Sequence, residues 1–166
     1  MTNNIEPLDP DEFRTAMRRW ATGVTIVTAQ HDSIQHGMTV SSFTSISLEP
    51  PLVMVSLGQT TKTIQLIHAS GFFGVSILAE DQQRISDSFA GRLPEVEYKF
   101  DSVDWTTLTS GSPLLVSGLA SFDCRVISAQ DFGMQTIFIG EVVGLRLGKN
   151  SNPLIYFERD YHQVVG

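Results

Sequence analysis

The sequence predicts a mainly β protein, an antiparallel β-barrel decorated with a few short helices. About seven segments carry the β-branched or alternating apolar pattern of strands, and most follow one another through short polar turns, as in hairpins. About three further segments carry helix-start signals. Because strands and helices do not alternate strictly, and no G-x-G-x-x-G motif follows the first strand, we do not expect a Rossmann sheet.

The first predicted element is a helix that begins at Asp9. An aspartate N-cap, a proline directly after it and acidic residues in the first turn all favour a helix start. Phe13, Met17 and Trp20 recur at spacings of four and three, which predicts one apolar face. Gly23 is expected to end the helix. The arginines of the helix, which are Arg14, Arg18 and Arg19, are expected to form a solvated face.

Three strands are predicted next. Residues 24–28 are β-branched, residues 30–36 make a polar turn, and residues 37–48 form a long second strand that completes a hairpin. The prolines at positions 50 and 51 interrupt the chain, so residues 52–57 are expected to form a separate strand.

Two helices flank a strand in the middle of the chain. A threonine, Thr60 or Thr61, is expected to cap a helix that Gly71 ends. Residues 72–78 form the strand, and residues 81–89 form a short helix capped by the aspartate at position 81.

The last third of the chain begins with an irregular segment, residues 91–112, in which Phe100 and Trp105 are expected to be anchors. Two long strands and an aromatic tail follow, at residues 113–128, 135–147 and 153–161. No repeat, low-complexity stretch or linker divides the chain, so we expect one domain over residues 1–166.

Composition excludes several classes of function. The 166 residues carry a net charge of −7, from 18 acidic and 11 basic residues, which excludes nucleic acid as the main partner. Cys124 is the single cysteine, so an intrachain disulfide is excluded. Residues 1–10 are polar, and no apolar run approaches the ~20 residues of a membrane span. We therefore expect a cytoplasmic protein that makes no membrane contact.

Small hydroxyl side chains crowd the predicted strand at residues 37–48. They are Thr39, Ser41, Ser42, Thr44, Ser45 and Ser47. Compact donors and acceptors close to the backbone suit a flat ligand with carbonyls, ring nitrogens and a phosphate tail. The alternative is a strand whose small side chains only permit close packing of the sheet.

Two further segments carry groups that suit a phosphate. Residues 60–63 place three threonines and Lys62 at a helix start, where free backbone N–H groups favour anions. The alternative is an ordinary threonine cap with an exposed lysine. Arg92 follows a glycine after a short helix, where it either reaches a phosphate or is a solvated charge.

The chain offers no constellation for acid–base, nucleophilic or metal chemistry. His31, His36, His68 and His162 have no metal-site spacing, and no Ser–His–Asp order appears. Cys124 alternates like a core position and is expected to be a buried, inert thiol. Such a chain fits a reaction in which bound cofactors supply the reacting groups, because the protein then needs no catalytic side chain.

Residues 37–50 resemble a segment that lines the flavin site in the flavin reductase-like family, the small reductase components of two-component flavin monooxygenases. The shared pattern is Gly-Met-Thr-x-x-x-Phe-x-Ser-x-Ser-Leu-x-Pro. Further similar pieces lie at residues 13–17, 21–25, 81–82, 89–91, 139–142, 153–154 and 161–162. Their order and spacing make the resemblance specific, and it implies a split β-barrel of the FMN-binding type that binds flavin as a homodimer.

The resemblance also implies site residues, position by position. The flavin ring and ribityl chain are expected at Met38, Thr39, Val40, Ser41, Ser42, Phe43, Ser45 and Ile46. The phosphate end is expected at Ser56, Thr61, Lys62 and Thr63, with Phe89 and Arg92 close to the flavin. The nicotinamide is expected at Tyr156, Phe157, Arg159 and Tyr161, together with Gln135. The cofactor is FMN or FAD, and the reductant is NADH or NADPH.

Gln135 departs from the family pattern. The family has Gly-Asp-His or Gly-x-His at this place, whereas this chain reads Gly-Met-Gln. A glutamine donates a hydrogen bond but carries no charge, so the departure bears on how the reductant is bound.

Three hypotheses follow. The first is an NAD(P)H-dependent flavin reductase that delivers reduced flavin to a partner oxygenase, and it predicts that free flavin behaves as a substrate. The second is a reductase that retains its flavin and passes electrons to another acceptor. The third is a non-enzymatic flavin-binding or heme-binding split-barrel protein, which predicts no turnover.

Overall fold

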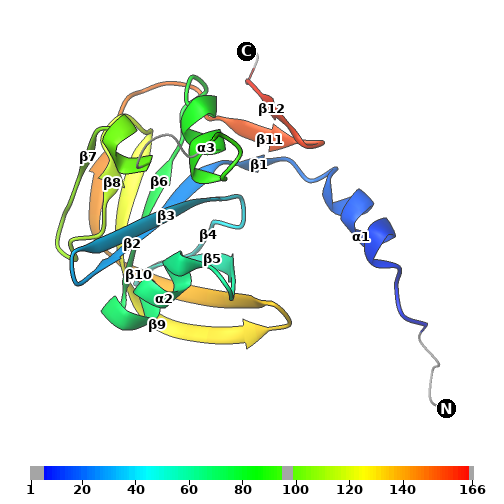
Figure 1. Ribbon diagram of the computed structural model, residues 1–166, viewed down its shortest axis with the longest axis horizontal. Coiled ribbons are helices and arrows are strands. Elements are labelled where there is room, and N and C mark those ends of the chain that lie inside the picture. Colours follow the sequence, from blue (N-terminus) through cyan, green and yellow to red (C-terminus); the bar gives the residue numbers. More distant parts are fainter. Residues whose placement is uncertain (1–5, 95–98, 165–166) are drawn as a thin grey trace.

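A computed structural model describes residues 6–94 and 99–164, so the first half of the polar segment 1–10 and part of the irregular segment 91–112 lie outside the described residues. Its main feature is a seven-stranded antiparallel sheet (Figure 1). The strands are β2 (Thr25–His31), β3 (Ile34–Val40), β4 (Thr44–Leu48), β5 (Pro51–Gly58), β6 (Phe72–Ile77), β9 (Ala120–Phe132) and β10 (Gln135–Leu147). Their order in the sheet is β3-β2-β6-β9-β10-β5-β4. The predicted mainly β, antiparallel fold is confirmed.

The sheet curls into a barrel that is open along one seam. Strands β3 and β4 are the two edges of the sheet, yet only residues 41–43 separate them in the chain. An extended chain advances at most about 3.6 Å per residue, so this short link brings the two edges close together. Each edge strand pairs with one neighbour only, β3 with β2 and β4 with β5. This is the arrangement expected of a split barrel.

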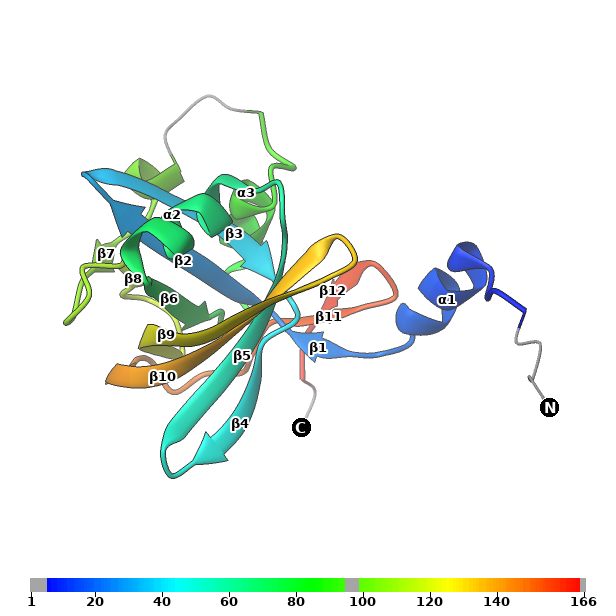
Figure 2. The same cartoon turned by 90° about the horizontal axis from the view of Figure 1, so that it is seen from below.

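Short elements surround the barrel. The strands β1 (Thr22–Gly23), β11 (Ile155–Phe157) and β12 (Asp160–His162) form a small sheet, and β7 (Trp105–Thr106) pairs with β8 (Leu114–Leu115). The helices are α1 (Pro10–Met17), α2 (Lys62–Ser70), α3 (Gln83–Phe89) and the 3₁₀ turn η1 (Lys99–Ser102). Figures 1 and 2 both show α1 apart from the barrel, as an arm that leads into β1. None of the described helices is both long enough and apolar enough to span a membrane.

Two apolar clusters form the core. In the first, Ile64 and Ile67 of α2 pack with Phe73 and Phe138 of the sheet. In the second, Phe89 of α3 packs with residues of η1, β8 and the segment before β11. Burying a large apolar side chain contributes about 1.5–3 kcal/mol, so α2 and the C-terminal end of α3 are fixed to the barrel.

Cys124 lies in the first cluster and is fully buried. Burial, with a smaller contribution from the charge of Asp123, raises the pKa of its thiol to about 12. A thiol with so high a pKa stays protonated at neutral pH, so the prediction of a buried, inert cysteine is confirmed.

Local signals located most helix ends correctly. The Asp9 carboxylate accepts a hydrogen bond from the backbone N–H of Asp11 at 2.9 Å, and the Thr61 hydroxyl accepts one from Ile64 at 3.5 Å. Gly71 ends α2 with φ of 76°. The expected cap at position 81 is wrong, because α3 begins at Gln83 and its N-cap residue, Gln82, makes no side-chain cap bond.

Asp81 and Gln82 are both engaged elsewhere. The carboxylate of Asp81 accepts hydrogen bonds of 2.6 and 2.7 Å from the ammonium of Lys149. The Gln82 side chain accepts from the backbone N–H of Ala79 at 2.8 Å and donates to Ser117 at 2.8 Å. These partners are distant in sequence or belong to the preceding loop, so the pattern of the helix itself does not predict them.

Two predicted long strands are divided in the structure. Residues 37–48 belong to β3 and β4, which lie at opposite edges of the sheet. Residues 113–128 belong to β8 and β9, separated at residues 116–119. A side chain at Gly118 would lie 2.7 Å from the carbonyl oxygen of Ile77, so a glycine is needed where this link crosses β6. The hairpin turn is also shorter than expected, because Asp32 and Ser33 alone complete it, both with positive φ.

Two details differ from expectation. The residues of the predicted apolar face of the first helix, Phe13, Met17 and Trp20, each keep half or more of their surface exposed. The helix also ends at Met17, well before Gly23. Of the two expected anchors of the segment 91–112, Phe100 is buried, whereas Trp105 contacts it at the surface, with 6.1 Å between the ring centroids.

Candidate functional site

Two adjoining cavities lie where β3, α3 and the small C-terminal sheet meet. The first, the tyrosine cavity, has a volume of about 140 Å³ and is lined by Thr39, Ser41, Ser86, Arg92, Tyr156 and Tyr161. The second, the arm cavity, has a volume of about 430 Å³ and lies between α1 and the small sheet. The arm cavity is lined by Arg14, Arg18, Trp20, Phe157 and Arg159, together with Ser41, Ser42 and Tyr156. Ser41 and Tyr156 line both cavities, so the two are neighbours.

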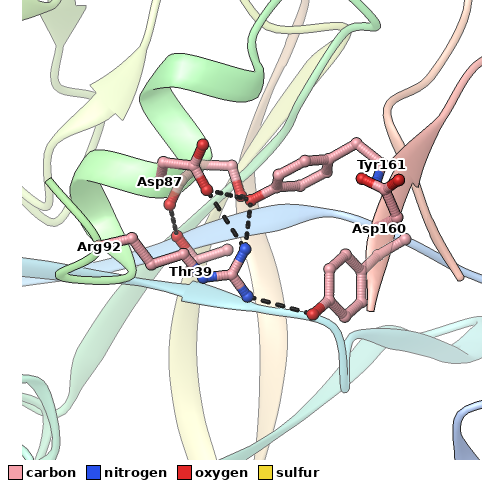
Figure 3. A network of polar contacts seen from close by, with 7 residues as sticks. Thr39, Asp87, Arg92, Asp160 and Tyr161 are labelled. Carbon is pink, nitrogen blue, oxygen red and sulfur yellow. Dashed lines mark hydrogen bonds and ion pairs between the residues drawn. The ribbon is translucent and has the colours of Figure 1, made fainter. Parts of the chain in front are cut away.

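Arg92 is the centre of a polar network in the tyrosine cavity (Figure 3). Its guanidinium donates to the carboxylate of Asp87 at 3.2 Å and to the hydroxyls of Tyr161 and Tyr156 at 3.3 and 3.1 Å. Its Cζ also lies 5.5 Å from the ring centroid of Tyr156 and 5.8 Å from that of Tyr161. The hydrogen bond with Tyr156 is the largest influence that raises the pKa of Arg92, which therefore stays charged.

Tyr161 joins this network to α3. Its hydroxyl lies 2.8 Å from the Ser86 hydroxyl and 2.9 Å from the Asp87 carboxylate, either of which accepts its proton. Burial raises the pKa of Tyr161, so the phenol remains a donor at neutral pH. Thr39 donates to the carbonyl oxygen of Ser86 at 2.6 Å and so ties β3 to the same helix.

The link between β3 and β4 is fastened by Ser42. Its hydroxyl donates to the carbonyl oxygen of Ser56 at 2.8 Å and accepts from the N–H of the same residue at 3.0 Å. Ser41 precedes it and is exposed at the junction of the two cavities. The link therefore presents the Ser41 side chain to a ligand, while the Ser42 hydroxyl is used within the protein.

Other residues of the predicted flavin segment lie outside the cavities. Val40 is buried, and Met38 and Phe43 pack against the first core cluster, where the rings of Phe43 and Phe122 stack at 5.7 Å. Ser45 and Ile46 are exposed on β4. Phe89 is only 2% exposed and belongs to the second cluster, so its ring supports the site from the core.

Three of the four predicted phosphate residues lie at the start of α2, and the fourth, Ser56, lies on β5. Lys62 is exposed, and Thr61 is half-buried and caps the helix. Thr63 is fully buried, and its hydroxyl lies 2.8 Å from Nδ1 of His36. Of these three residues Lys62 is the exposed one, beside the free N–H groups of the first turn, while the Thr63 side chain supports the helix start from the protein interior.

His36 predicts a pH dependence of stability. Burial, followed by the charges of Lys99 and Lys62, lowers its pKa from 6.5 in the folded protein. As the pH falls below 6.5 the unfolded chain takes up the proton first, so the free energy of unfolding decreases until the pH has passed the folded pKa. We expect wild type to lose more stability than His36→Gln between about pH 8 and about pH 5.5, measured by urea denaturation. Equal losses would contradict the role of His36.

Gln135 lies beside the phosphate residues and away from the tail aromatics. It is the first residue of β10, pairs with Gly58, and its carbonyl accepts a hydrogen bond of 3.4 Å from Gln59. A side chain at Gly58 would lie 3.8 Å from both Gln135 Nε2 and Thr61 Cγ2, so these residues are neighbours. The tip of the β9–β10 hairpin and the β11–β12 sheet lie apart in Figure 1. The predicted nicotinamide residues are thus divided between two places within one chain.

The sequence pattern missed four residues of the site. Ser86 and Asp87 of α3 hold Tyr161, and Arg14 and Arg18 line the arm cavity, although a solvated face was expected of the arginines. Arg19 does lie on the opposite side of α1. No local signal separates these arginines, because the position of the arm on the small sheet decides which of them line the cavity.

Comparison with known proteins agrees with this arrangement. A family model described as "Flavin reductase like domain" matches residues 17–165. The chain belongs to the flavin reductase-like family. The resemblance of the segment 37–50 is therefore confirmed, and the fold and the cavities described above are those of a member of this family.

Two relatives and one solved structure are similar over nearly the whole chain. The reductase subunit HsaB of a flavin-dependent monooxygenase from Rhodococcus jostii is 38% identical over 156 residues, which are 94% of this chain and 78% of HsaB. The FMN reductase (NADH) RutF from Ancylobacter novellus is 36% identical over 156 residues, 94% of this chain and 86% of RutF. The structure of the flavin reductase PheA2 has a TM-score of 0.88 and 37% identity, covering 96% of this chain and all of PheA2.

Proposed function

We propose that the protein is an NAD(P)H-dependent flavin reductase that supplies reduced FMN or FAD to a partner monooxygenase. One observation carries the proposal: the hydroxyl-rich segment at Thr39 and Ser41, the cation Arg92 and the tail tyrosines meet at a single cavity. Membership of the flavin reductase-like family supports the same function. The single cysteine and the use of NAD(P)H fit a cytoplasmic location.

The residues present fit a flavin. Ser41 offers an exposed hydroxyl beside the backbone of residues 40–43, and such groups suit the carbonyl and nitrogen edge of the ring. Lys62 and the first turn of α2 suit the phosphate end. Three predicted residues support the site without facing it. Ser56 is hydrogen-bonded to Ser42, Thr63 is hydrogen-bonded to His36, and Phe89 packs in the second core cluster. Ser45 and Ile46 extend the same segment at the edge of the barrel.

The chain's own residues position the two cofactors and shield them from water, and they are not needed as acids or bases. A bound flavin and a bound nicotinamide would supply the hydride-transfer chemistry between them. Arg92 is held by Asp87 and both tyrosines, so its charge and the two rings are fixed before a ligand arrives. Pre-ordered groups of this kind bring two reacting rings together at a low entropic cost.

The choice of reductant is expected to depend on Gln135. Gln135→His restores the family residue, and we expect it to raise kcat/KM for NADH about tenfold, because a histidine offers a ring nitrogen donor and a charge below neutral pH. The rate of NADH oxidation with saturating FMN is the measurement. Gln130→His, on the neighbouring strand β9, is the matched control. An unchanged kcat/KM would show that position 135 plays no part in binding the reductant.

We also propose that the protein is a homodimer, on the strength of the outer face of the sheet. In β10 the residues Thr136 and Phe138 are buried, whereas Ile137 and Ile139 alternate with them and point outward. Met54 of β5 lies next to Ile139 on this outer face. The outer face also carries Leu52 and Ile127. An apolar face of this kind is typical of a surface that a second copy covers.

Light scattering tests the dimer. We expect wild type to have twice the mass of the chain in solution and Ile139→Lys to have the mass of one chain, because a buried, unpaired ammonium is costly in an interface. Arg125→Lys, on the neighbouring strand, keeps its charge and is expected to stay dimeric. A monomeric wild type at micromolar concentration would refute the dimer.

The decisive experiment for the function follows the absorbance of NADH and then of NADPH, mixed with purified protein with and without FMN or FAD. Oxidation that requires added flavin and saturates with it supports the proposal. Oxidation without added flavin, by protein that retains it, favours a reductase for another acceptor. Flavin binding without oxidation of either nucleotide leaves a flavin carrier and refutes the reductase.

A further inference from the structure

Two of the three lysines of the chain lie near the edge strand β3. Lys62 is the first residue of α2, which packs on β3. Lys99 is the first residue of η1, and its ammonium lies 5.9 Å from the ring centroid of Phe89. That ring lies against β3, because a Cβ on Gly37 would be 2.8 Å from it. Neither lysine forms an ion pair with another described residue, so both ammonium groups are available to an anion.

The charges of both lysines act on His36, the residue before Gly37 on β3. The His36 side chain is half-buried, and its Nδ1 lies 2.8 Å from the hydroxyl of Thr63 in the first turn of α2. Burial, followed by the charges of Lys99 and Lys62, lowers the pKa of His36 from 6.5. The imidazole is therefore largely neutral at pH 7 in the protein without a ligand.

No carboxylate offsets this positive charge in the part of the chain that the structure describes. Both charged groups that act on His36 are cations. The neighbour of His36 on β2 is Ala29, which carries no charge. The acid of α3, Asp87, is paired with Arg92 at 3.2 Å. The chain as a whole has a net charge of −7, so these cations form a local exception whose mutual repulsion a bound anion relieves.

We propose that His36 takes up a proton when the phosphate of the flavin binds beside Lys62 and Lys99. This proposal rests on the proposed function, which puts the phosphate end of the flavin at the start of α2. A negative charge within about 4–6 Å favours the charged form of an imidazole. The second pKa of a phosphate monoester is about 6, so at pH 7 the free ligand is already largely a dianion and the proton goes to the imidazole. In the charged ring both nitrogens donate, and the Thr63 oxygen accepts from Nδ1.

Proton uptake and phosphate binding affect each other equally. Because the phosphate favours the charged ring, the charged ring tightens phosphate binding by the same factor. We expect the Kd of FMN to be about fivefold lower at pH 6.5 than at pH 8, since His36 is charged in the complex at the lower pH and neutral at the higher. Riboflavin has the same ring and ribityl chain without the phosphate, so its Kd is expected to be equal at both pH values.

Isothermal titration measures the proton directly. FMN is titrated into the protein at pH 7 in two phosphate-free buffers that differ in ionisation enthalpy. We expect wild type to take up about half a proton per FMN and His36→Gln to take up none. His31→Gln is the matched control, because His31 is at the turn of the same hairpin beside Asp32, and it is expected to behave as wild type. Urea denaturation at pH 8, where His36 is neutral, establishes that the variants are folded.

The two lysines are tested with a lysine outside the site. Lys99→Gln is expected to raise the Kd of FMN about tenfold and to leave that of riboflavin unchanged, because it removes one charge beside the phosphate. Lys149→Gln is the matched control, since its ammonium is held by the carboxylate of Asp81 at 2.6 Å. We expect wild-type affinity for both flavins from this control.

Three results overturn the proposal. They are no proton uptake by wild type, equal uptake by wild type and His36→Gln, and equal affinity of wild type for FMN and riboflavin. NADH oxidation by wild type with FMN is measured in the same buffers. If the oxidation persists while the proton uptake is absent, the reductase function stands and only the role of His36 is refuted, so the two failures are distinguishable.

Discussion

Replacing Ser41 with tryptophan is expected to lower kcat/KM for flavin-dependent NADH oxidation about a hundredfold or more, while the protein stays folded. Ser41 is exposed and lines both cavities, so an indole at this position fills the tyrosine cavity and the entrance to its neighbour. A displacement of about 1 Å between reacting groups already costs roughly a hundredfold in rate, and a blocked site costs at least as much. The measurements are NADH oxidation and FMN binding by fluorescence quenching.

Thr107→Trp is the matched control for this variant. Thr107 is exposed in the loop after β7, which Figure 1 shows on the opposite side of the barrel from β11 and β12. We expect wild-type rates from it. Urea denaturation of both variants separates a blocked site from a misfolded chain. A folded Ser41→Trp protein with wild-type turnover would place the flavin site away from the two cavities and contradict the proposed function.

Local physics explains the parts of the fold that the sequence predicts well. Asp9 and Thr61 cap their helices because the acceptor and the N–H groups that it satisfies lie within three residues. The hairpin of β2 and β3 and the long strand β10 follow from alternating patterns over neighbouring residues. In each case the sequence segment contains all the groups that decide the structure.

The division of residues 37–48 depends on distant parts of the chain. The segment has a continuous hydroxyl-rich pattern, yet residues 41–43 leave one edge of the sheet and enter the other. The bonds that hold this link come from Ser56 on β5, and those that hold Thr39 come from α3. The pattern of side chains along residues 37–48 therefore cannot predict these hydrogen bonds, because their partners lie elsewhere in the chain.

The residues of the site, like the division of residues 37–48, depend in part on contacts that are distant in sequence. Resemblance to the family pointed to Thr39, Ser41, Arg92 and the tail tyrosines, and the structure brings these residues to one cavity. The sequence predicts a solvated Arg18, because a helix pattern indicates only which residues share a face. Its place beside Glu158 depends on how the arm lies on the small sheet. The neighbours of Gln135, which are Gly58 and Gln59, likewise depend on how β10 pairs with β5, and the sequence around Gln135 does not show this pairing.

The largest loss of stability is expected from Gly140→Ala, because the barrel interior has no room at this position. A Cβ on Gly140 would lie 2.5 Å from Cζ of Phe73 and 3.0 Å from Cβ of Cys124. Both neighbours are fully buried, so the ring of Phe73 has no free space to enter. Overpacking of this kind costs about 3 kcal/mol, which corresponds to a fall in the melting temperature of about 10 °C.

Gly23→Ala is the control for Gly140→Ala, because nothing lies within 4 Å of a Cβ at Gly23. Calorimetry is expected to show a wild-type melting temperature for the control and a large fall for Gly140→Ala. The comparison isolates packing from the conformational freedom that any glycine substitution removes. Gly140 also pairs β10 with β5 and with β9, so a loss confined to Gly140→Ala would show that close approach of Phe73 to the β10 backbone holds the barrel together. Equal melting temperatures would mean that β10 shifts to admit the methyl group, and the barrel would then be more compliant than its packed core implies.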